Sequence, residues 1–174
     1  MARGLTSLLQ LIATPATTAA EATLPALDIL DGPRFAWRGL TVDVVRRFFP
    51  PAQVRALIDL AALYKLDVLH LHLTDDQGWR IEAGRPAPLR EPDSFYTNDD
   101  LSALESYAAD RFVTLLPEVD TPGHALALLS LHPELRSGRN LVHRSAWLDP
   151  DLPATLPLMD AATTSSRPWP TACR

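Results

Sequence analysis

One apolar segment of the chain ends abruptly in two adjacent acids: residues 68–82 read VLHLHLTDDQGWRIE. The run up to Leu73 has the length and the apolar content of a buried β-strand. Packing gives no reason for Asp75 and Asp76 at its exit, so these acids either bind something polar or solvate a turn. Residues 111–125, RFVTLLPEVDTPGHA, repeat the pattern. The two segments therefore predict two strands whose ends form two edges of one polar pocket.

Predicted strands and helices alternate along the chain. We expect strands at residues 35–44, 66–73 and 112–116. Helices are expected to begin at Pro51, after a cap at Thr97 or Asn98, and at Gly123. The strands are too apolar to face water on either side, which predicts a parallel sheet with helices outside it.

A doubly wound sheet and a (β/α)8 TIM barrel both satisfy this order of elements. Five acids at or near the carboxyl ends of the expected strands favour the barrel, because barrel enzymes keep their chemistry at that end. They are Asp43, Asp75, Asp76, Glu118 and Asp120. A whole barrel needs roughly 250 residues. Three βα units in 174 residues therefore predict an α/β fold that is an incomplete barrel.

Composition excludes several classes of protein. A hydrophobic content of 47% is that of a globular chain with a sizeable core. The net charge of -5, with scattered basic residues, argues against nucleic-acid binding. No run of 18 apolar residues occurs, so we expect no membrane span. Cys173 is the single cysteine, which leaves the redox compartment and the localisation undetermined.

The two ends of the chain differ in composition and apolar periodicity from its middle. Residues 1–20 loosely imitate a signal peptide, but the apolar spacing from Leu5 to Ile12 fits one face of a helix better. Residues 13–30 are small, polar and proline-punctuated, which is typical of a linker. Residues 31–163 are expected to carry the partial barrel. Residues 164–174 have no period, and we interpret them as a non-native or disordered tail, with the reading frame lost near Thr163.

Charged residues on the first two expected strands suggest a site for hydroxyl groups. Carboxylates such as Asp75 and Asp76, and a guanidinium such as Arg38, bind vicinal hydroxyls of sugars through charge-assisted hydrogen bonds. Alternatively, Arg38 forms an ion pair with Asp43 in the mouth of the barrel. Trp79 offers a ring face for a sugar, although packing explains it equally well.

Two histidines alternate with leucines in the second expected strand. His70 and His72 therefore point to the same side of the sheet. With Asp75, Asp120 or His124 they suggest a metal site, and the alternative is a pair of core histidines bonded to carboxylates. His124, after Pro122-Gly123, is placed to orient or tune a catalytic carboxyl group.

Four segments in order resemble the catalytic barrel of family 20 glycoside hydrolases, the β-N-acetylhexosaminidases. They read WRGLTVDVVRRFFP, ALYKLDVLHLHLTDDQGWRIE, FYTNDDL and RFVTLLPEVDTPGHA. The resemblance implies removal of terminal non-reducing N-acetylglucosamine or N-acetylgalactosamine from oligosaccharides by a retaining, substrate-assisted mechanism. It also implies that residues 1–12 are the last helix of a preceding small α/β domain, and that no metal or other cofactor is needed.

The resemblance assigns roles in the site to six residues. Asp75 and His124 would form a pair that supports the general acid, and Arg38 would hold the outer hydroxyls of the sugar. The pocket floor would be shaped by the remaining acids: Asp76, Glu118 and Asp120. Asp43 would be structural.

One part of the family pattern is missing from these residues. The general acid Glu and its neighbouring Asp follow a His and two Gly residues in the family, and no such string occurs here. We therefore expect this chain alone to be inactive. Two alternatives stay open: a metal-dependent hydrolase that uses His70, His72 and Asp120, and a non-catalytic sugar-binding remnant.

Overall fold

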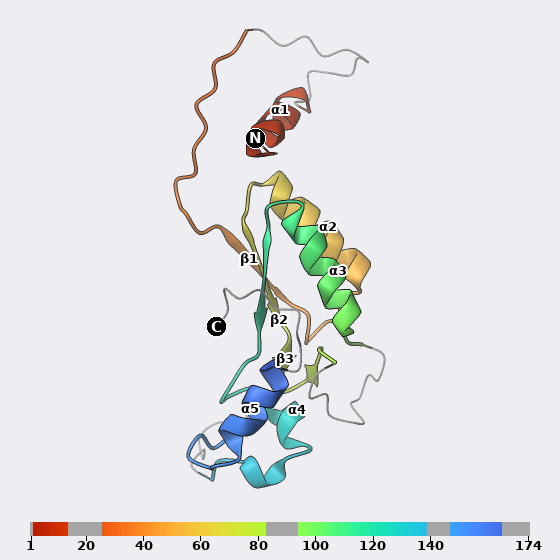
Figure 1. The fold of residues 1–174 in the computed structure, drawn as a ribbon, viewed down its shortest axis with the longest axis vertical. Coiled ribbons are helices and arrows are strands. Elements are labelled where there is room, and N and C mark those ends of the chain that lie inside the picture. Colours follow the sequence, from red (N-terminus) through yellow and green to blue (C-terminus); the bar gives the residue numbers. More distant parts are fainter. Residues whose placement is uncertain (1, 14–25, 83–93, 139–146, 165–174) are drawn as a thin grey trace.

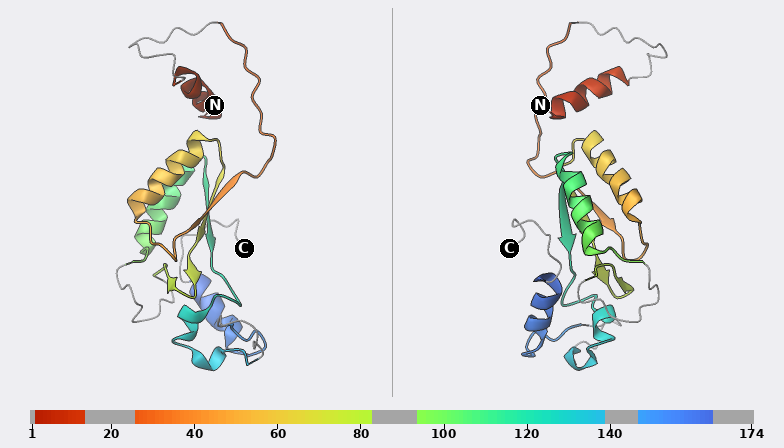
Figure 2. Two further views of the ribbon diagram at one scale, coloured as in Figure 1. Left: turned by 180° about the vertical axis from the view of Figure 1, so that it is seen from behind. Right: turned by 45° about the vertical axis from the view of Figure 1, so that its right-hand side comes forward.

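A three-stranded parallel sheet forms the centre of the computed structural model, which describes residues 2–13, 26–82, 94–138 and 147–164. The strands lie in the order β1 (Gly39–Asp43), β2 (Val68–His72) and β5 (Thr114–Glu118). Two helices, α2 (Pro51–Leu63) and α3 (Asn98–Ala109), cover the same face of the sheet (Figures 1 and 2). This confirms the predicted alternation of parallel strands and helices.

Short elements follow the carboxyl ends of the strands. A two-stranded hairpin of β3 (Thr74–Asp75) and β4 (Gly78–Trp79) lies directly after β2. Three further helical elements gather at the same end of the sheet (Figure 1). They are α4 (Leu126–Leu129), the 3-10 turn η1 (Pro133–Leu135) and α5 (Thr155–Thr164). The hairpin was not foreseen, because a strand of two residues leaves too short a pattern to read.

The helix α1 (Ala2–Ile12) lies at the opposite end of the sheet (Figure 1). The Arg3 side chain donates to the Lys65 carbonyl at 2.5 Å, and the Gln10 amide donates to the Leu63 carbonyl at 2.8 Å. These bonds attach α1 to the end of α2. A helix is therefore present within residues 1–12, and residues 26–30 have no regular secondary structure.

Local signals define the boundaries of the two long helices. Pro51 occupies the first turn of α2, where a missing N–H costs nothing. The Thr97 hydroxyl accepts from the Asp100 N–H at 3.0 Å, and the Asp100 carboxylate accepts from the Thr97 N–H at 3.0 Å. This capping box fixes the start of α3.

The core lies between the sheet and these two helices. Alternate residues of β2, Leu69 and Leu71, are fully buried against the helix side, where each contributes roughly 1.5–3 kcal/mol. Ile58 of α2 and Leu104 of α3 are also fully buried. None of the helices in the described residues has both the length and the apolar content that crossing a bilayer requires.

Several predicted boundaries are wrong. The first strand begins at Gly39 rather than residue 35, and Phe35 is largely exposed before it. The last strand begins at Thr114, because Phe112 has a φ of 58°, which a strand residue does not adopt. His124, with a φ of 54°, likewise restricts the helix expected at 123–131 to Leu126–Leu129. Most of the tail at 164–174 lies outside the described residues.

Candidate active site

The carboxyl ends of the three parallel strands bring polar residues into register. Asp43 of β1 is paired with His72 of β2, which in turn is paired with Glu118 of β5. Asp75 follows within the hairpin after β2. Because these strands are parallel, residues 43, 72 and 118 lie side by side at the carboxyl end of the sheet, although they are far apart in sequence.

The Asp75 carboxylate is the centre of this group. Its side chain is fully buried, and Oδ1 accepts from the Asp76 N–H at 2.6 Å and from His124 Nδ1 at 2.9 Å. Oδ2 accepts from His72 Nε2 at 3.1 Å and forms an ion pair with the Arg46 guanidinium. Burial alone would raise the pKa of Asp75, but the hydrogen bonds from Asp76, His72 and His124 and the charge of Arg46 hold it below its ordinary value.

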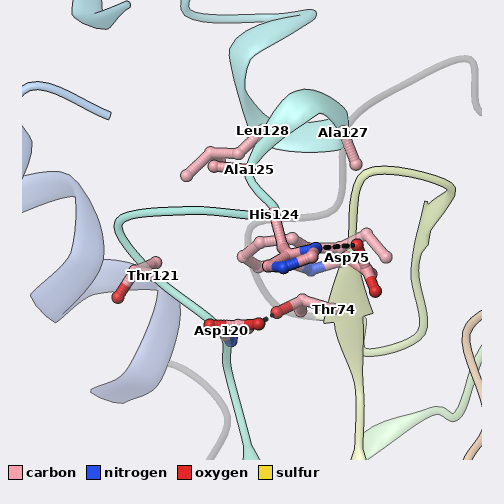
Figure 3. A pocket seen from close by; sticks show the side chains of 9 residues that line it. Thr74, Asp75, Asp120, Thr121, His124, Ala125, Ala127 and Leu128 are labelled. Carbon is pink, nitrogen blue, oxygen red and sulfur yellow. Dashed lines mark hydrogen bonds and ion pairs between the residues drawn. The ribbon is translucent and has the colours of Figure 1, made fainter. Parts of the chain in front are cut away.

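His124 reaches Asp75 from the loop that follows β5 (Figure 3). An ionised carboxylate only accepts hydrogen bonds, so Nδ1 of His124 carries the proton in this contact. The other ring nitrogen, Nε2, is then the one left to exchange a proton with a further group. The side chain is 50% exposed, so such a group has access to it.

The side chain of Asp76, the acid next to Asp75, binds the backbone of the same loop. Asp76 Oδ1 accepts from the N–H of Leu126, the first residue of α4, at 2.9 Å. Nearby, the Asp120 N–H donates to the Thr74 hydroxyl at 2.9 Å (Figure 3). Together these bonds fix the loop between β5 and α4 against the hairpin.

A small recess opens between this loop and the hairpin. Its lining combines the polar residues described above with small and apolar side chains (Figure 3). They are Thr74, Asp75, Trp79, Asp120, Thr121, His124, Ala125, Ala127 and Leu128. Trp79 is only 2% exposed, so its ring is a packing residue here rather than an open platform.

The two histidines of β2 both bind Glu118. His70 Nε2 lies 2.7 Å from Glu118 Oε2, and His72 Nδ1 lies 2.8 Å from Glu118 Oε1. Burial opposes a charge on His72, but its hydrogen bonds to Glu118 and Asp75 outweigh burial and raise the pKa of this imidazole. The interpretation of His70 and His72 as histidines bonded to carboxylates is confirmed.

The metal alternative named a different set of ligands. In the described residues, the ligand-forming atoms of His72, Glu118 and Asp120 lie within 4.8 Å of one another, and so do those of Asp75, Asp76 and His124. His70 is not part of either group. The set His70, His72 and Asp120 is therefore wrong as it was predicted, since Glu118 rather than His70 lies with His72 and Asp120.

Arg38 does not belong to this group of residues, which corrects its predicted position. It precedes β1, at the amino end of the sheet, and its guanidinium forms an ion pair with Asp67 at 2.7 Å. The five residues of β1 separate Arg38 from the pocket by about 17 Å, at roughly 3.3 Å per residue. The alternative ion pair between Arg38 and Asp43 is wrong for the same reason.

Arg46 supplies the cation instead, a residue that was not predicted for the site. Its guanidinium lies 2.6 Å from Asp43 and also contacts Asp75, with its side chain 52% exposed. A signal was present: Arg46 follows Asp43 by three residues at the exit of the strand, where its main-chain N–H also donates to Asp43 at 3.0 Å. The expected strand ran one residue past Asp43, so the turn was not recognised.

Comparisons with known proteins agree on one family. Residues 35–159 match the family model described as glycosyl hydrolase family 20, catalytic domain. A β-N-acetylhexosaminidase of Cellulomonas fimi is 41% identical over 154 residues, which are 79% of this chain and 31% of that protein. A β-hexosaminidase of Porphyromonas gingivalis is 36% identical over 76% of this chain and 19% of its own length.

Solved structures give the same result. The family 20 β-N-acetylhexosaminidase of Streptomyces coelicolor A3(2) has a TM-score of 0.75 and 31% identity, over 97% of this chain and 39% of that one. This similarity confirms the (β/α)8 barrel as the fold class, of which the described residues contain three parallel strands. The chain spans about a fifth to a third of the length of these curated relatives.

Proposed function

Since this chain belongs to glycoside hydrolase family 20, we propose that it carries the part of a β-N-acetylhexosaminidase active site that holds a terminal non-reducing N-acetylhexosamine. The substrate would be an oligosaccharide that ends in N-acetylglucosamine or N-acetylgalactosamine. The Asp75–His124 pair at the carboxyl ends of the strands is the observation that carries this proposal.

The pair would support proton transfer without transferring the proton itself. Asp75 accepts a hydrogen bond from the Nδ1–H of His124 at 2.9 Å and thereby fixes the tautomer and the ring orientation. The Nε2 side of the ring would then face the carboxyl group of the general acid, whose protonation it would tune. Four donors already saturate Asp75, so this residue is not itself the general acid.

Arg46 replaces Arg38 as the proposed residue for the hydroxyls of the sugar. It is the cation at the pocket edge, half exposed, and two carboxylates hold its guanidinium in place. A guanidinium carries five N–H donors, so some remain for sugar oxygens. Arg38, by contrast, already donates to Asp67 and to the Lys65 carbonyl at the other end of the sheet.

Turnover needs groups that these 174 residues do not supply. In the substrate-assisted scheme that the family implies, the acetamido oxygen of the substrate attacks the anomeric carbon while an acid protonates the leaving oxygen. The sequence contains no Gly-Gly followed by an Asp-Glu pair. General acid catalysis is worth roughly 10²–10⁴-fold. We propose that this chain alone recognises the sugar but does not hydrolyse the glycoside.

A titration with a matched pair of variants tests recognition. N-acetylglucosamine should perturb the amide signals of the loop between β5 and α4 more than glucose does. Arg46→Gln should weaken this binding, whereas Arg47→Gln should not, because Arg47 lies over the Phe49 ring instead. An equal response to glucose, or equal effects of the two variants, would contradict the proposal.

A second assay tests turnover. The purified chain should release no p-nitrophenol from p-nitrophenyl N-acetyl-β-D-glucosaminide. Steady release that scales with protein concentration would show that a proton donor is present within these residues, and the assignment of a recognition role alone would be wrong.

A further inference from the structure

His72 is a buried titratable residue for which the proposed function has no use. Its imidazole lies between two acids from different elements: Nδ1 is 2.8 Å from Glu118 of β5, and Nε2 is 3.1 Å from Asp75 of β3. The residue is only 8% exposed, so water does not compete freely for either nitrogen.

We propose that His72 is a positioning residue whose imidazole, protonated on both nitrogens, bridges Asp75 and Glu118 and thereby sets the geometry of the Asp75–His124 pair. An ionised carboxylate only accepts hydrogen bonds, so a ring between two carboxylates makes both bonds only as an imidazolium. His70 differs, since its second contact is the Thr41 hydroxyl at 3.3 Å, which can donate as well as accept.

The charges around His72 support the bridge. Asp43 of β1, Asp75 of β3 and Glu118 of β5 all face it with negative charge, and Arg46 shares the Asp75 carboxylate from the other side. Burial disfavours the charged ring, yet the hydrogen bonds to Glu118 and Asp75 raise the pKa of His72. A cation at this point therefore offsets the repulsion among three acids that the parallel strands bring together.

The bridge has two consequences for the pocket. It occupies Oδ2 of Asp75, so that Oδ1 faces His124. It also fixes Glu118, whose other oxygen is held by His70 at 2.7 Å. Glu118 is then a counter-ion of two histidines rather than a residue that binds sugar. The bridge itself is independent of the proposed function, whereas its role in positioning the pair depends on it.

Side-chain nitrogen NMR of the whole 174-residue chain, ¹⁵N-labelled at histidine and dialysed against a chelator, tests the bridge. The shifts of Nδ1 and Nε2 report which nitrogens carry protons, and the signals lost in His72→Gln assign the residue. We expect both His72 nitrogens to be protonated at pH 7. A single protonated nitrogen at pH 7 in the unmodified chain would overturn the proposal, and this result needs no variant to fold.

A matched pair of variants tests the dependence on Glu118. Glu118→Gln should lower the titration midpoint of His72, whereas Glu134→Gln, which alters an exposed pair of Glu134 with His132, should leave it unchanged. His72→Gln should also shift the His124 nitrogen signals while circular dichroism stays that of the unmodified chain. Equal midpoints in both Glu variants, or unchanged His124 signals, would contradict the bridge. Failure of N-acetylglucosamine to bind, with the bridge intact, would contradict only the proposed function.

Discussion

Replacing Asp75 by Asn tests whether one buried carboxylate organises the site. The side chain is fully buried and accepts from four donors: the Asp76 N–H, His124, His72 and Arg46. An Asn has nearly the same shape, but it keeps one acceptor oxygen and turns an NH₂ group toward two of these donors. Two hydrogen bonds to a charged group are then lost, each worth about 1.5–3 kcal/mol.

The expected loss in the free energy of unfolding is therefore about 3–6 kcal/mol. This range includes the roughly 3–5 kcal/mol that removing one partner of a buried ion pair usually costs. Asp76→Asn is the matched control, since Asp76 is partly exposed and an Asn oxygen can still accept from the Leu126 N–H. We expect that control to change stability by less than about 0.5 kcal/mol. Urea unfolding followed by circular dichroism at pH 7 measures both.

The dependence on pH gives a second check of the same substitution. The pKa of Asp75 is held below the ordinary value of 3.8, so its stabilisation is present above that value and disappears as the pH falls through the pKa of the folded state. The difference in stability between the unmodified chain and Asp75→Asn should narrow below pH 3.8. If Asp75→Asn costs no more than Asp76→Asn at pH 7, Asp75 does not organise the site and the reasoning fails.

Three further substitutions have expected outcomes. His72→Gln should destabilise the chain most at acidic to neutral pH and progressively less as the pH rises. The pKa of His72 is raised in the folded state, so its stabilising contribution is full below about 6.5 and is lost as the pH rises through the folded-state pKa. Urea midpoints at a series of pH values measure this dependence, and a loss of stability that does not vary with pH would contradict it. Thr97→Ala removes the acceptor for the Asp100 N–H and should cost about 1 kcal/mol, whereas Thr97→Ser should cost much less in the same urea assay. Leu104→Ala opens a cavity in the fully buried core and should cost about 2–5 kcal/mol; a loss below 1 kcal/mol in thermal unfolding would show that the core is not packed as described.

Part of the pocket was predictable because polar residues directly after an apolar run mark the carboxyl end of a buried strand. The apolar run before Asp75 and the one before Glu118 identify two buried strands, and parallel pairing puts their ends together. Asp75 and His124 were accordingly expected to be partners and lie 2.9 Å apart. The capping residue Thr97 and the helix start at Pro51 were predicted for the same kind of reason, since each depends on neighbours only a few residues away.

The prediction for Arg38 failed because it depended on where a strand starts. Aromatic residues at 35 and 37 suggested a strand from residue 35, whereas the pairing of β1 with β2 begins only at Gly39. Arg38 therefore lies at the amino end of the sheet, and the arginine at the other end of β1 is Arg46. Sequence patterns do not distinguish two arginines eight residues apart when the boundary between them is uncertain.

The sequence by itself determined which segments contain the three parallel strands and the two helices that cover them, because hydrophobic period, proline and capping residues act over a few positions. Only the tertiary structure decided which polar side chains meet. Asp75 and His124 are 49 residues apart, and His72 and Glu118 are 46 apart. Such contacts depend on strand register and on the turns after each strand, and a shift of one residue would send each side chain to the other face of the sheet.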